Sequence, residues 1–455
     1  METFKKIIWK LRLSVKGNSL RFLKQLKHWQ WLEETQLAAL QKKRLADLLL
    51  HAYQRVPYYR ELFEKSGVID NSGIPDLYRF NQIPFLTKHI LRSRFDDLKS
   101  DDLSTRKWRL NWSGGSTGEP AKFIQDKQYW DWRDAVKMLY DIWTGYSFGE
   151  TKFLLWGSER DLFEGRDSIN SQIHRWLENK ILFNAYRMTS EQIYSCVEKI
   201  NTSKPIQILA YAESITDLSI FIKREGLRVH SPRAIITSAG MLLSSMRKNI
   251  ESAFKTSVFN RYGSREVGDM ACECDHHEGL HVSAPTHFIE ILNPDGSPTV
   301  IGGLGEIVVT NLTNYAMPLI RYRIGDMGIW GDPHCTCGRN WPLLKKVAGR
   351  IADTFKKKDG TLITSGPFNE LFHAYDWIER YQIIQEDYDF IRILFVPVER
   401  DASLQKDHKV EMMKITKKIR SVMGPKCEIT YEFVDDIPPS ASGKHRFTIS
   451  KVVDQ

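Results

Sequence analysis

Apolar residues near the start of the chain recur at the spacing of a helix. Between residues 30 and 66, apolar side chains three or four residues apart form one stripe, at Leu37, Leu40, Leu45, Leu48, Leu49 and Ala52. This period is typical of one face of an α-helix. The pattern therefore predicts that residues 30–66 are helical.

Further along, short apolar runs alternate with helical patterns. The runs Phe153–Trp156, Ile206–Ala210 and Ala234–Thr237 read as strands, and residues 215–224 between the last two read as a helix. Such alternation favours a parallel α/β sheet. From residue 279 the hydrophobic pattern changes. The apolar runs 288–292 and 305–310 now flank the turn sequence Asn-Pro-Asp-Gly at 293–296. This order of strand, turn and strand predicts a small antiparallel β subdomain.

A domain boundary is predicted near residues 349–353. Downstream, strands are expected at 381–385, 390–396 and 428–434, with a helix over 404–422. About 100 residues are enough for a compact α+β domain. We therefore expect an α/β protein with a large N-terminal domain, 1–350, and a small mobile α+β C-terminal domain, 351–455.

The positive charge is concentrated in an N-terminal arm, residues 1–28. The whole chain carries a net charge of +9, and the arm alone holds eight Lys or Arg residues against the single acid Glu2. Phe4, Ile7, Ile8, Leu11 and Val15 recur at helical spacing, which indicates a basic amphipathic helix. Such a helix either makes a peripheral contact with an anionic membrane or packs its apolar stripe on the domain. No nucleic-acid-binding module accompanies the charge, so nucleic acid is not expected as a partner.

Composition excludes several other classes. The chain has 455 residues, of which 42% are hydrophobic and 27% charged, as in ordinary soluble proteins. It contains no apolar run long enough for a transmembrane helix, and Lys10, Arg12 and Lys16 interrupt any secretory signal. We therefore expect a cytoplasmic protein.

Five short motifs carry the chemistry. They are Ser113–Pro120 (SGGSTGEP), Tyr262–Glu266 (YGSRE), Tyr322–Asp326 (YRIGD), Gly349–Asp353 (GRIAD) and Pro438–Lys444 (PPSASGK). In this order and at these separations they resemble the adenylate-forming superfamily of acyl-CoA synthetases, adenylation domains and luciferases. The stretch from His51 to Tyr59 resembles the phenylacetate–CoA ligase-like branch, which includes homologues associated with polysaccharide gene clusters. The resemblance covers residues 37–450.

The first motif is rich in glycine and hydroxyl groups, which suit a loop that cradles phosphate. The resemblance implies a phosphate-binding loop made of Ser113, Gly114, Gly115, Ser116, Thr117 and Gly118, in which Ser116 and Thr117 contact phosphate and Thr117 also serves catalysis. The sequence is not a Walker A loop, because no Gly-Lys-Ser/Thr follows. Where the superfamily usually has Lys, this chain has Ala121 followed by Lys122, which leaves open whether Lys122 replaces it.

The remaining motifs imply nucleotide contacts. Tyr262 matches the residue that stacks on adenine, and Glu266 matches the Mg²⁺-binding carboxylate, with Gly263, Ser264 and Arg265 between them. Ser238, Ala239 and Gly240 match the adenine-side loop, although many relatives carry Glu where Gly240 stands. Asp326 matches the carboxylate that accepts hydrogen bonds from the ribose hydroxyls, and Arg350 matches a residue that reaches the nucleotide.

Two positions bear on domain motion. The family's hinge motif ends in Asp-Asp and here reads Ala352-Asp353, so the hinge residue is either of these two. Lys444 matches the lysine that enters the site for adenylation, where a point charge suits the departing pyrophosphate.

Cysteine and histidine residues indicate a metal site. Two Cys-x-Cys pairs, 272/274 and 335/337, lie in a chain without a secretory signal, which favours metal over disulfides. Similar sets occur in the phenylacetate-like branch. The predicted structural zinc ligands are Cys274, His281, Cys335 and Cys337, with Cys272, His276 and His277 as alternatives. The competing interpretation is a group of reduced, unliganded thiols.

The resemblance implies a reaction in two steps. A carboxylate and ATP, with Mg²⁺, give an acyl-adenylate and pyrophosphate, and the acyl group then passes to CoA; transfer to an amine is the alternative. Lys444, Glu266 and Thr117 are the expected catalytic residues. The stretch 210–214 lines the acid in relatives, and its Glu213 either pairs with a cationic substrate or is solvated. The sequence leaves open which carboxylate is used and the oligomeric state, a dimer included.

Overall fold

The computed structural model describes residues 17–70, 73–113, 120–156, 175–185, 188–364, 368, 371–372, 375, 377–398, 408–438 and 446–452. The phosphate-loop positions 114–119, Lys444 and the apolar positions 4–15 of the arm lie outside these residues.

The N-terminal region is helical, as predicted, but it consists of separate helices. These are α2 (Ser19–Trp29), α3 (Glu34–Arg55), α4 (Pro57–Ser66) and α5 (Lys88–Ser93), with short 3₁₀ turns at Leu77–Gln82 and Leu103–Thr105. The break between α3 and α4 follows from Pro57, which lacks the N–H that a continuing helix needs but fits the first helical position. Gly67, in the left-handed conformation, ends α4.

A two-stranded hairpin and a long helix follow. The strands β1 (Trp108–Trp112) and β2 (Lys122–Asp126) pair antiparallel, and β2 leads directly into α6 (Lys127–Trp143). The carboxylate of Asp126 accepts a hydrogen bond from the backbone N–H of Tyr129 and so caps α6. The predicted phosphate loop is therefore the connection between two strands of a hairpin.

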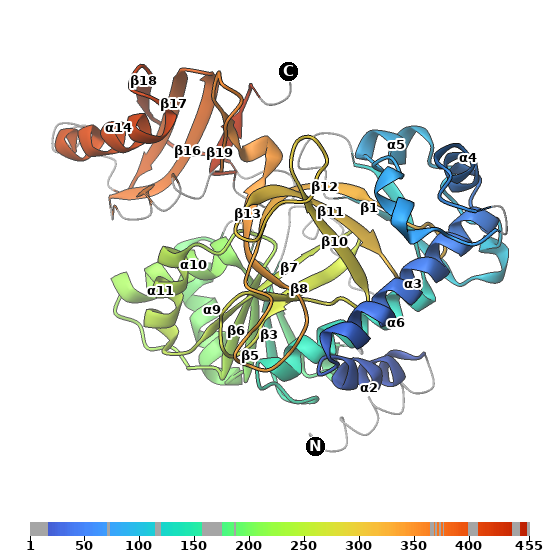
Figure 1. The fold of residues 1–455 in the computed structure, drawn as a ribbon. Coiled ribbons are helices and arrows are strands. Elements are labelled where there is room, and N and C mark those ends of the chain that lie inside the picture. Colours follow the sequence, from blue (N-terminus) through green and yellow to red (C-terminus); the bar gives the residue numbers. More distant parts are fainter. Residues whose placement is uncertain are drawn as a thin grey trace.

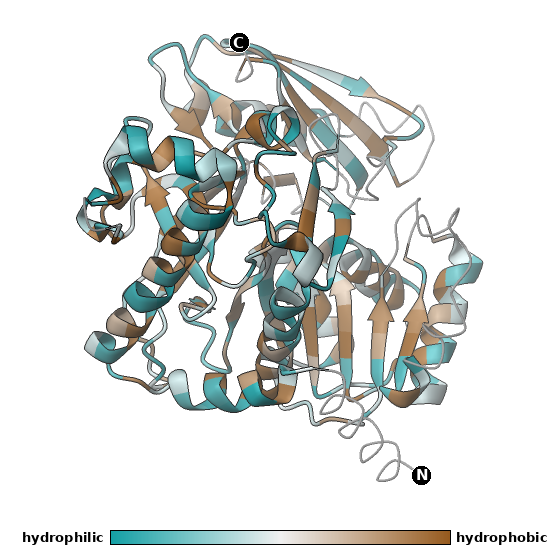
Figure 2. Cartoon of the chain, turned by 90° about the vertical axis from the view of Figure 1, so that its right-hand side faces the viewer, coloured by the Kyte–Doolittle hydropathy of each residue, from teal (hydrophilic) through white to brown (hydrophobic). Residues whose placement is uncertain are grey.

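The parallel sheet is present as expected. Its strands are β3 (Lys152–Leu155), β4 (Lys180–Phe183), β5 (Gln207–Tyr211), β6 (Ala234–Ser238) and β7 (Val258–Ser264). Helices α9 (Ser190–Ser203), α10 (Ala212–Arg224) and α11 (Ser244–Phe254) lie beside these strands (Figure 1). The strands are largely hydrophobic (Figure 2), as is typical of a sheet buried on both faces.

The antiparallel strands predicted after residue 279 are also present, but they continue the parallel sheet. They comprise β8 (Gly268–Glu273), β9 (Leu280–Val282), β10 (His287–Leu292), β11 (Leu304–Asn311), β12 (Tyr322–Trp330) and β13 (Leu343–Arg350). The strand order is β10-β11-β12-β13-β9-β8-β7-β6-β5-β3-β4. Strand β7 joins the two halves, because it pairs parallel with β6 and antiparallel with β8.

The C-terminal part has its own sheet and its own core. After a 3₁₀ turn at Ile351–Asp353 come β14 (Phe355–Lys356), β15 (Leu362–Ile363), β16 (Ile378–Asp387), β17 (Phe390–Pro397), α14 (Lys409–Met423), β18 (Glu428–Phe433) and β19 (Thr448–Ser450). The larger sheet has the order β18-β17-β16-β19, and α14 buries Ile415 and Ile419 against it. This unit stands apart from the main body in Figure 1. We call it the C-terminal unit.

The described part of the basic arm packs on the main body. Helix α2 buries Leu23 and Leu26 in a core shared with α6, and Phe22 stacks on Trp132 with ring centroids 3.9 Å apart. At its beginning, the backbone N–H of Asn18 and the hydroxyl of Ser19 donate to Asp131. Residues 17–28 thus follow the packing interpretation, and membrane contact through the arm stays a prediction. Among the described residues, no helix has the length and apolarity needed to cross a bilayer.

Candidate active site

A cavity of about 650 Å³ opens at the carboxyl ends of the parallel strands. Tyr211, Ser238 and Tyr262, from the ends of β5, β6 and β7, line it together with Asp326 and Arg350 from β12 and β13. Ligands of open α/β sheets bind at this edge, because the loops that follow the strands converge there. Every predicted nucleotide-contacting residue within the described parts of the chain lines this cavity, except Ser113.

The side chains of three separate motifs meet on one wall. Tyr262 Oη donates a hydrogen bond of 2.7 Å to Asp326 Oδ2, and burial raises the pKa of Tyr262, so the phenol stays protonated. Strands β12 and β13 pair Asp326 with Arg350 directly, and Arg350 Nε lies 3.8 Å from Asp326 Oδ1. The Asp326 carboxylate thus has one strong donor, on Oδ2, and one more distant cationic neighbour, near Oδ1.

Gly263 is required by the packing of its motif. A Cβ at this position would lie 2.6 Å from the carbonyl oxygen of Gly268 on the neighbouring strand, closer than real carbon atoms approach. Directly after β7, the carbonyl oxygens of Arg265 and Glu266 accept hydrogen bonds from Gln125 Nε2 on β2, at 2.8 and 3.2 Å. This contact ties the Tyr262–Glu266 motif to β2 and holds the Glu266 backbone beside the cavity.

The loop Ser238–Gly240 has an unusual conformation. Ala239 has φ 68°, in the left-handed region that costs a residue with a Cβ about 1 kcal/mol or more. The carboxylate of Glu213, at the beginning of α10, fills the space that a Cβ on Gly240 would need. Glu213 is therefore part of the cavity wall.

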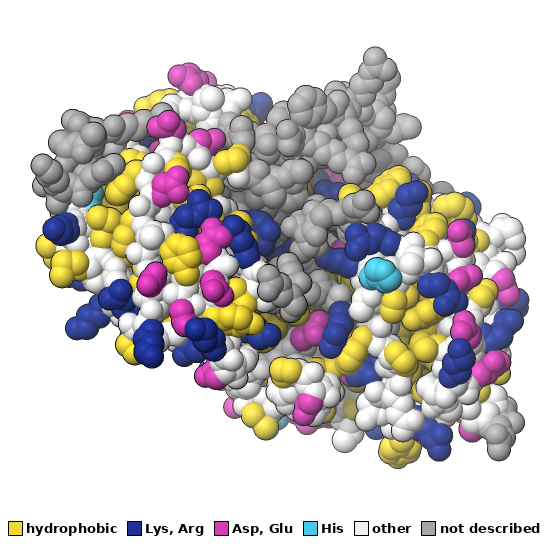
Figure 3. Space-filling model, turned by 90° about the horizontal axis from the view of Figure 1, so that it is seen from above, with side chains coloured by type: hydrophobic (Ala, Val, Ile, Leu, Met, Phe, Trp, Pro, Cys, Tyr) yellow, Lys and Arg dark blue, Asp and Glu magenta, His cyan; other side chains and the backbone are white. Residues whose placement is uncertain are grey.

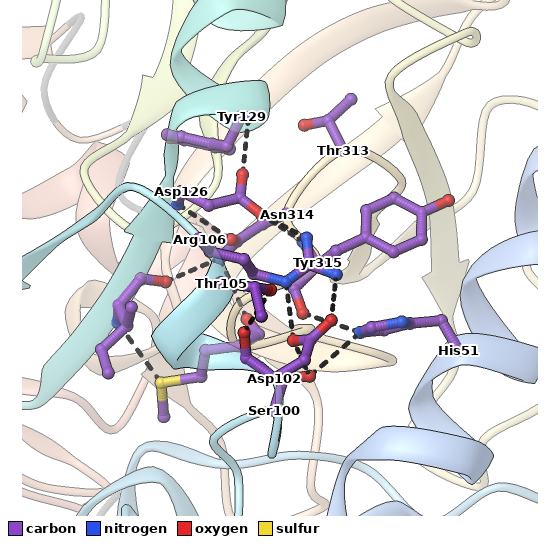
Figure 4. A network of polar contacts seen from close by, with 12 residues as sticks. His51, Ser100, Asp102, Thr105, Arg106, Asp126, Tyr129, Thr313, Asn314 and Tyr315 are labelled. Carbon is purple, nitrogen blue, oxygen red and sulfur yellow. Dashed lines mark hydrogen bonds and ion pairs between the residues drawn. The ribbon is translucent and has the colours of Figure 1, made fainter.

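A polar network holds the base of the hairpin that carries the predicted phosphate loop (Figure 4). Arg106, just before β1, donates two hydrogen bonds of 2.7 Å to Asp102 and one of 3.2 Å to Asp126 at the end of β2. Asp126 also accepts from the backbone N–H of Tyr315. The hydrogen bonds from Arg106 lower the pKa of Asp102 to about 2. Both ends of the hairpin are thus fixed to the main body.

The same network contains Ser100, His51 and Asp102, but they do not form a nucleophilic triad. Ser100 Oγ donates to Asp102 at 2.7 Å, and His51 Nε2 lies 2.9 Å from the carbonyl oxygen of Tyr315, to which it donates. A triad instead needs the serine proton directed at a free imidazole nitrogen. The arrangement is structural.

At the ends of the predicted phosphate loop, Ser113 and Ala121 form a closed pair. Ser113 N–H donates to the Ala121 carbonyl, and Ser113 Oγ accepts from the Ala121 N–H, both at 2.9 Å. Ala121 is completely buried, whereas Lys122 is exposed and is not among the described residues that line the cavity. The interior position explains why a small residue stands where the superfamily usually has Lys.

Sequence reasoning missed Lys88, the first residue of α5. Lys88 lines the cavity, where the charges of Glu266 and Asp326 attract it and that of Arg350 repels it, while burial lowers its pKa. It lies in none of the five motifs, so only the fold brings it to the site. The cavity thus has a lysine near the Glu266 carboxylate although residue 121 is alanine.

The C-terminal unit closes one side of the cavity. Arg446, Phe447 and Thr448 contribute to the lining, and Arg446 Nη2 and Nε donate to Asp353 Oδ1 at 2.6 and 3.1 Å. Asp353 is one of the two predicted hinge residues, and burial raises its pKa although the Arg446 charge opposes this. The ion pair therefore links the hinge region to the chain just after Lys444.

Four side chains of the types that bind metal ions lie together. They come from the β8–β9 segment and from the connection between β12 and β13. The ligand atoms of Cys274, His281, Cys335 and Cys337 all lie within 4.8 Å of one another. Cys274 Sγ is 3.7 Å from Cys335 Sγ, close to the roughly 3.8 Å expected for sulfurs that share a tetrahedral zinc with bonds of about 2.3 Å. The alternatives lie elsewhere: Cys272 packs in the α2–α6 core, and His276 and His277 contact Thr336 and Glu273.

His281 and Cys337 have pKa shifts in the direction that suits a metal, whereas burial raises the pKa of the Cys274 and Cys335 thiols while no ion is bound. His281 Nδ1 lies 3.3 Å from the Trp341 carbonyl, to which it donates, so Nε2 is left with a lone pair and faces Cys337 Sγ at 3.3 Å. Burial lowers the pKa of His281 to about 4, which keeps the ring neutral. Burial opposes ionisation of Cys337, but hydrogen bonds from Arg339 and the neighbouring thiols lower its pKa overall. A neutral imidazole and thiolates are the forms that bind zinc.

Comparison with known proteins agrees with this fold. Residues 355–451 match the family model "CapK C-terminal domain". Protein CapK of Staphylococcus aureus is 25% identical over 464 residues, covering 98% of this chain and 97% of that protein. Phenylacetate-coenzyme A ligase of Thermus thermophilus is 24% identical over 440 residues, covering 91% and 96%. Over almost its whole length, this chain is therefore similar to CapK and to phenylacetate-coenzyme A ligases.

Solved structures of adenylate-forming enzymes share the fold. A crystal structure of 2-hydroxyisobutyryl-CoA ligase in its postadenylation state superposes with a TM-score of 0.71, at 19% identity, covering 91% of this chain and 89% of that one. The same enzyme in its thioesterification state gives a TM-score of 0.57.

Proposed function

We propose that this protein activates a small-molecule carboxylate with ATP, forming an acyl-adenylate and releasing pyrophosphate. The observation that carries the proposal is the meeting of Tyr262, Asp326 and Arg350, from three distant motifs, on one wall of the cavity. In the reaction, a carboxylate oxygen attacks the α-phosphorus of ATP, and the bond from that phosphorus to pyrophosphate breaks. Acyl transfer to CoA, giving a thioester and AMP, follows.

Each residue takes a role that its chemistry suits. Asp326 accepts hydrogen bonds from the ribose hydroxyls, and Tyr262, held by Asp326, stacks on adenine. Glu266 is a largely buried carboxylate beside the cavity and fits Mg²⁺, which needs few protein ligands when phosphate oxygens and water complete its shell. When bound, Mg²⁺ neutralises phosphate charge. Lys88 and Arg350 supply the fixed positive charges near the phosphates.

Two predicted catalytic residues, Thr117 and Lys444, lie outside the described residues, and their roles rest on the family resemblance. Their described neighbours support the assignment. The pairing of Ser113 with Ala121 holds the base of the loop that contains Thr117. Lys444 lies two residues before Arg446, which lines the cavity. The C-terminal unit then rotates about Ala352 or Asp353 for the second step.

A structural zinc ion held by Cys274, His281, Cys335 and Cys337 is the second part of the proposal. Cys274 and His281 come from the β8–β9 hairpin, and the other pair lies between β12 and β13. Because these pairs are distant in sequence, the metal would tie two segments together. None of the four is among the described residues that line the cavity, so we assign the metal no role in the reaction.

The experiment is a product analysis with purified protein. ATP, Mg²⁺ and a panel of acids are incubated alone, with CoA, or with amines such as hydroxylamine. The proposal expects AMP and pyrophosphate that depend on the acid, and a thioester when CoA is present. Amide formation with a natural amine, together with no effect of CoA, favours the alternative acceptor. Acid-dependent ADP and phosphate would refute adenylate formation.

A further inference from the structure

One face of helix α6 lines the cavity with charged side chains. Arg133, Lys137 and Asp141 follow one another at intervals of four residues, so they lie along one face of the helix. The side chains of Arg133 and Lys137 are 37% and 33% accessible. Because both line the cavity, ligand entering it would meet these two cations.

Other charged residues of the same region form complete pairs. Lys152 Nζ lies 2.6 Å from Asp141, and Lys180 Nζ lies 2.9 Å from Glu178. These four charges balance one another. Figure 3 shows acidic and basic side chains close together on the face seen from above.

Around Asp269 the positive charges are in excess. This carboxylate on β8 lies 3.3 Å from Arg261, 3.7 Å from Arg133 and 3.8 Å from Lys137. These separations are too long for strong hydrogen bonds, and both Arg133 Nε and Asp269 Oδ2 are buried atoms without a hydrogen-bond partner in the part of the chain that the structure describes. Asp134 is the other carboxylate that Lys137 and Arg133 attract. Three cations thus share two carboxylates.

An excess cation in a partly enclosed cavity is costly unless an anion accompanies it. Burial lowers the pKa of Lys137 to about 8, because the charged form loses hydration that its neighbours only partly replace. An aromatic or alkyl group placed against Arg133 and Lys137 would remove the remaining water without supplying an acceptor. An anionic group would accept their hydrogen bonds and balance the charge.

We propose that the acid which this site activates carries a second anionic group, a carboxylate or a phosphate, held by Arg133 and Lys137. The inference rests on the proposed adenylation and names its substrate class. The first carboxylate reacts at the α-phosphorus of ATP, while the second group forms no bond and orients the substrate. The class excludes phenylacetate-like and fatty acids as preferred substrates.

The test compares matched acids in acid-dependent ATP–pyrophosphate exchange. Each dianionic acid is paired with a monoanionic acid of the same skeleton: glutarate with valerate, 4-carboxyphenylacetate with phenylacetate, and phosphoglycolate with glycolate. We expect kcat/KM to be about 100-fold higher for the dianionic member, because each of the two charge-assisted contacts contributes about 10-fold. Comparing the carboxylate and phosphate arms identifies the second group.

Variants assign the preference to the two cations. Arg133→Met and Lys137→Met should each lower the ratio of dianionic to monoanionic kcat/KM by about 10-fold, the value of one such contact, and Lys137→Arg should keep most of it. Lys127→Met, on the same helix but outside the cavity lining, is the matched control and should keep the wild-type ratio. Circular dichroism establishes that each variant is folded.

The results separate the inference from the function on which it depends. Exchange that is as good or better with the monoanionic member of every pair overturns the second anionic group and leaves adenylation intact. An unchanged ratio in both methionine variants overturns the assignment to Arg133 and Lys137. Exchange with none of the six acids, nor with a wider panel of amino, sugar and fatty acids, overturns the proposed function and this inference with it.

Discussion

Two cysteines, Cys272 on strand β8 and Cys274 directly after it, allow the zinc proposal to be tested against a matched control. Both are completely buried, yet only Cys274 belongs to the four-residue cluster. Changing either to alanine removes one buried thiol from the same short segment. The difference between Cys274→Ala and Cys272→Ala therefore isolates the contribution of the metal.

The size of that difference follows from linkage. Loss of a small buried side chain costs about 1 kcal/mol of unfolding free energy in both variants. A zinc ion that binds only the folded chain adds about 4 kcal/mol when its free concentration is 1,000 times Kd. At about 2 °C for each kcal/mol in a chain of this size, Cys274→Ala should melt roughly 8 °C below Cys272→Ala.

The assay is elemental analysis combined with thermal unfolding. Wild type and Cys272→Ala, purified without chelator, should contain about one zinc per chain, and Cys274→Ala should contain almost none. A chelator should lower the Tm of the first two and leave that of Cys274→Ala unchanged. Absence of metal from the wild type, or equal zinc content in the two variants, would refute the site.

Three other predictions follow from particular contacts. Asp326→Asn should raise the ATP KM by about 10-fold or more, because the ribose hydroxyls lose a charged acceptor, and isothermal calorimetry with unchanged ATP affinity would contradict this. Gly240→Ala should reduce adenylation strongly while Tm changes little, because the new Cβ must displace the Glu213 carboxylate; normal kinetics would mean that the loop is not at the nucleotide. The pKa of Asp102, lowered to about 2, means that its pairing with Arg106 stabilises the fold fully above the ordinary value of 3.8 and is lost as the pH falls through 2. In urea unfolding, Asp102→Asn should therefore be less stable than wild type at pH ~6, and the gap should shrink below pH ~3.8; a gap independent of pH would contradict the pairing.

Much of the fold could be predicted because the hydrophobic pattern within each segment indicates its secondary structure. The strands 207–211 and 234–238 appear as mostly apolar runs, and the C-terminal strands and helix were predicted in the right order. The predicted boundary of the two domains stays a prediction. The sequence did not predict that the antiparallel strands join the parallel sheet. This joining depends on β7, which pairs parallel with β6 on one side and antiparallel with β8 on the other.

Only some of the site residues could be predicted from the sequence. The four cysteine and histidine residues were recognisable because their spacing is local, and the nucleotide motifs because they resemble a family. Lys88 and the Arg133–Lys137 pair were not, because charged residues at helical spacing are usually on a solvated face. Only the tertiary structure turns that face of α6 toward a cavity. The role of Glu213 likewise depends on contact between two segments that are distant in sequence.

The central claim is that the carboxylate oxygen becomes bonded to AMP, and an oxygen-18 label tests this directly. The acid with the highest activity is labelled in its carboxylate and converted in the presence of ATP and CoA, and the AMP is analysed by mass spectrometry. Our account predicts one labelled oxygen in AMP, because the bond to the acyl carbon breaks when the acceptor attacks. Unlabelled AMP, or label found in inorganic phosphate alongside ADP, would contradict it.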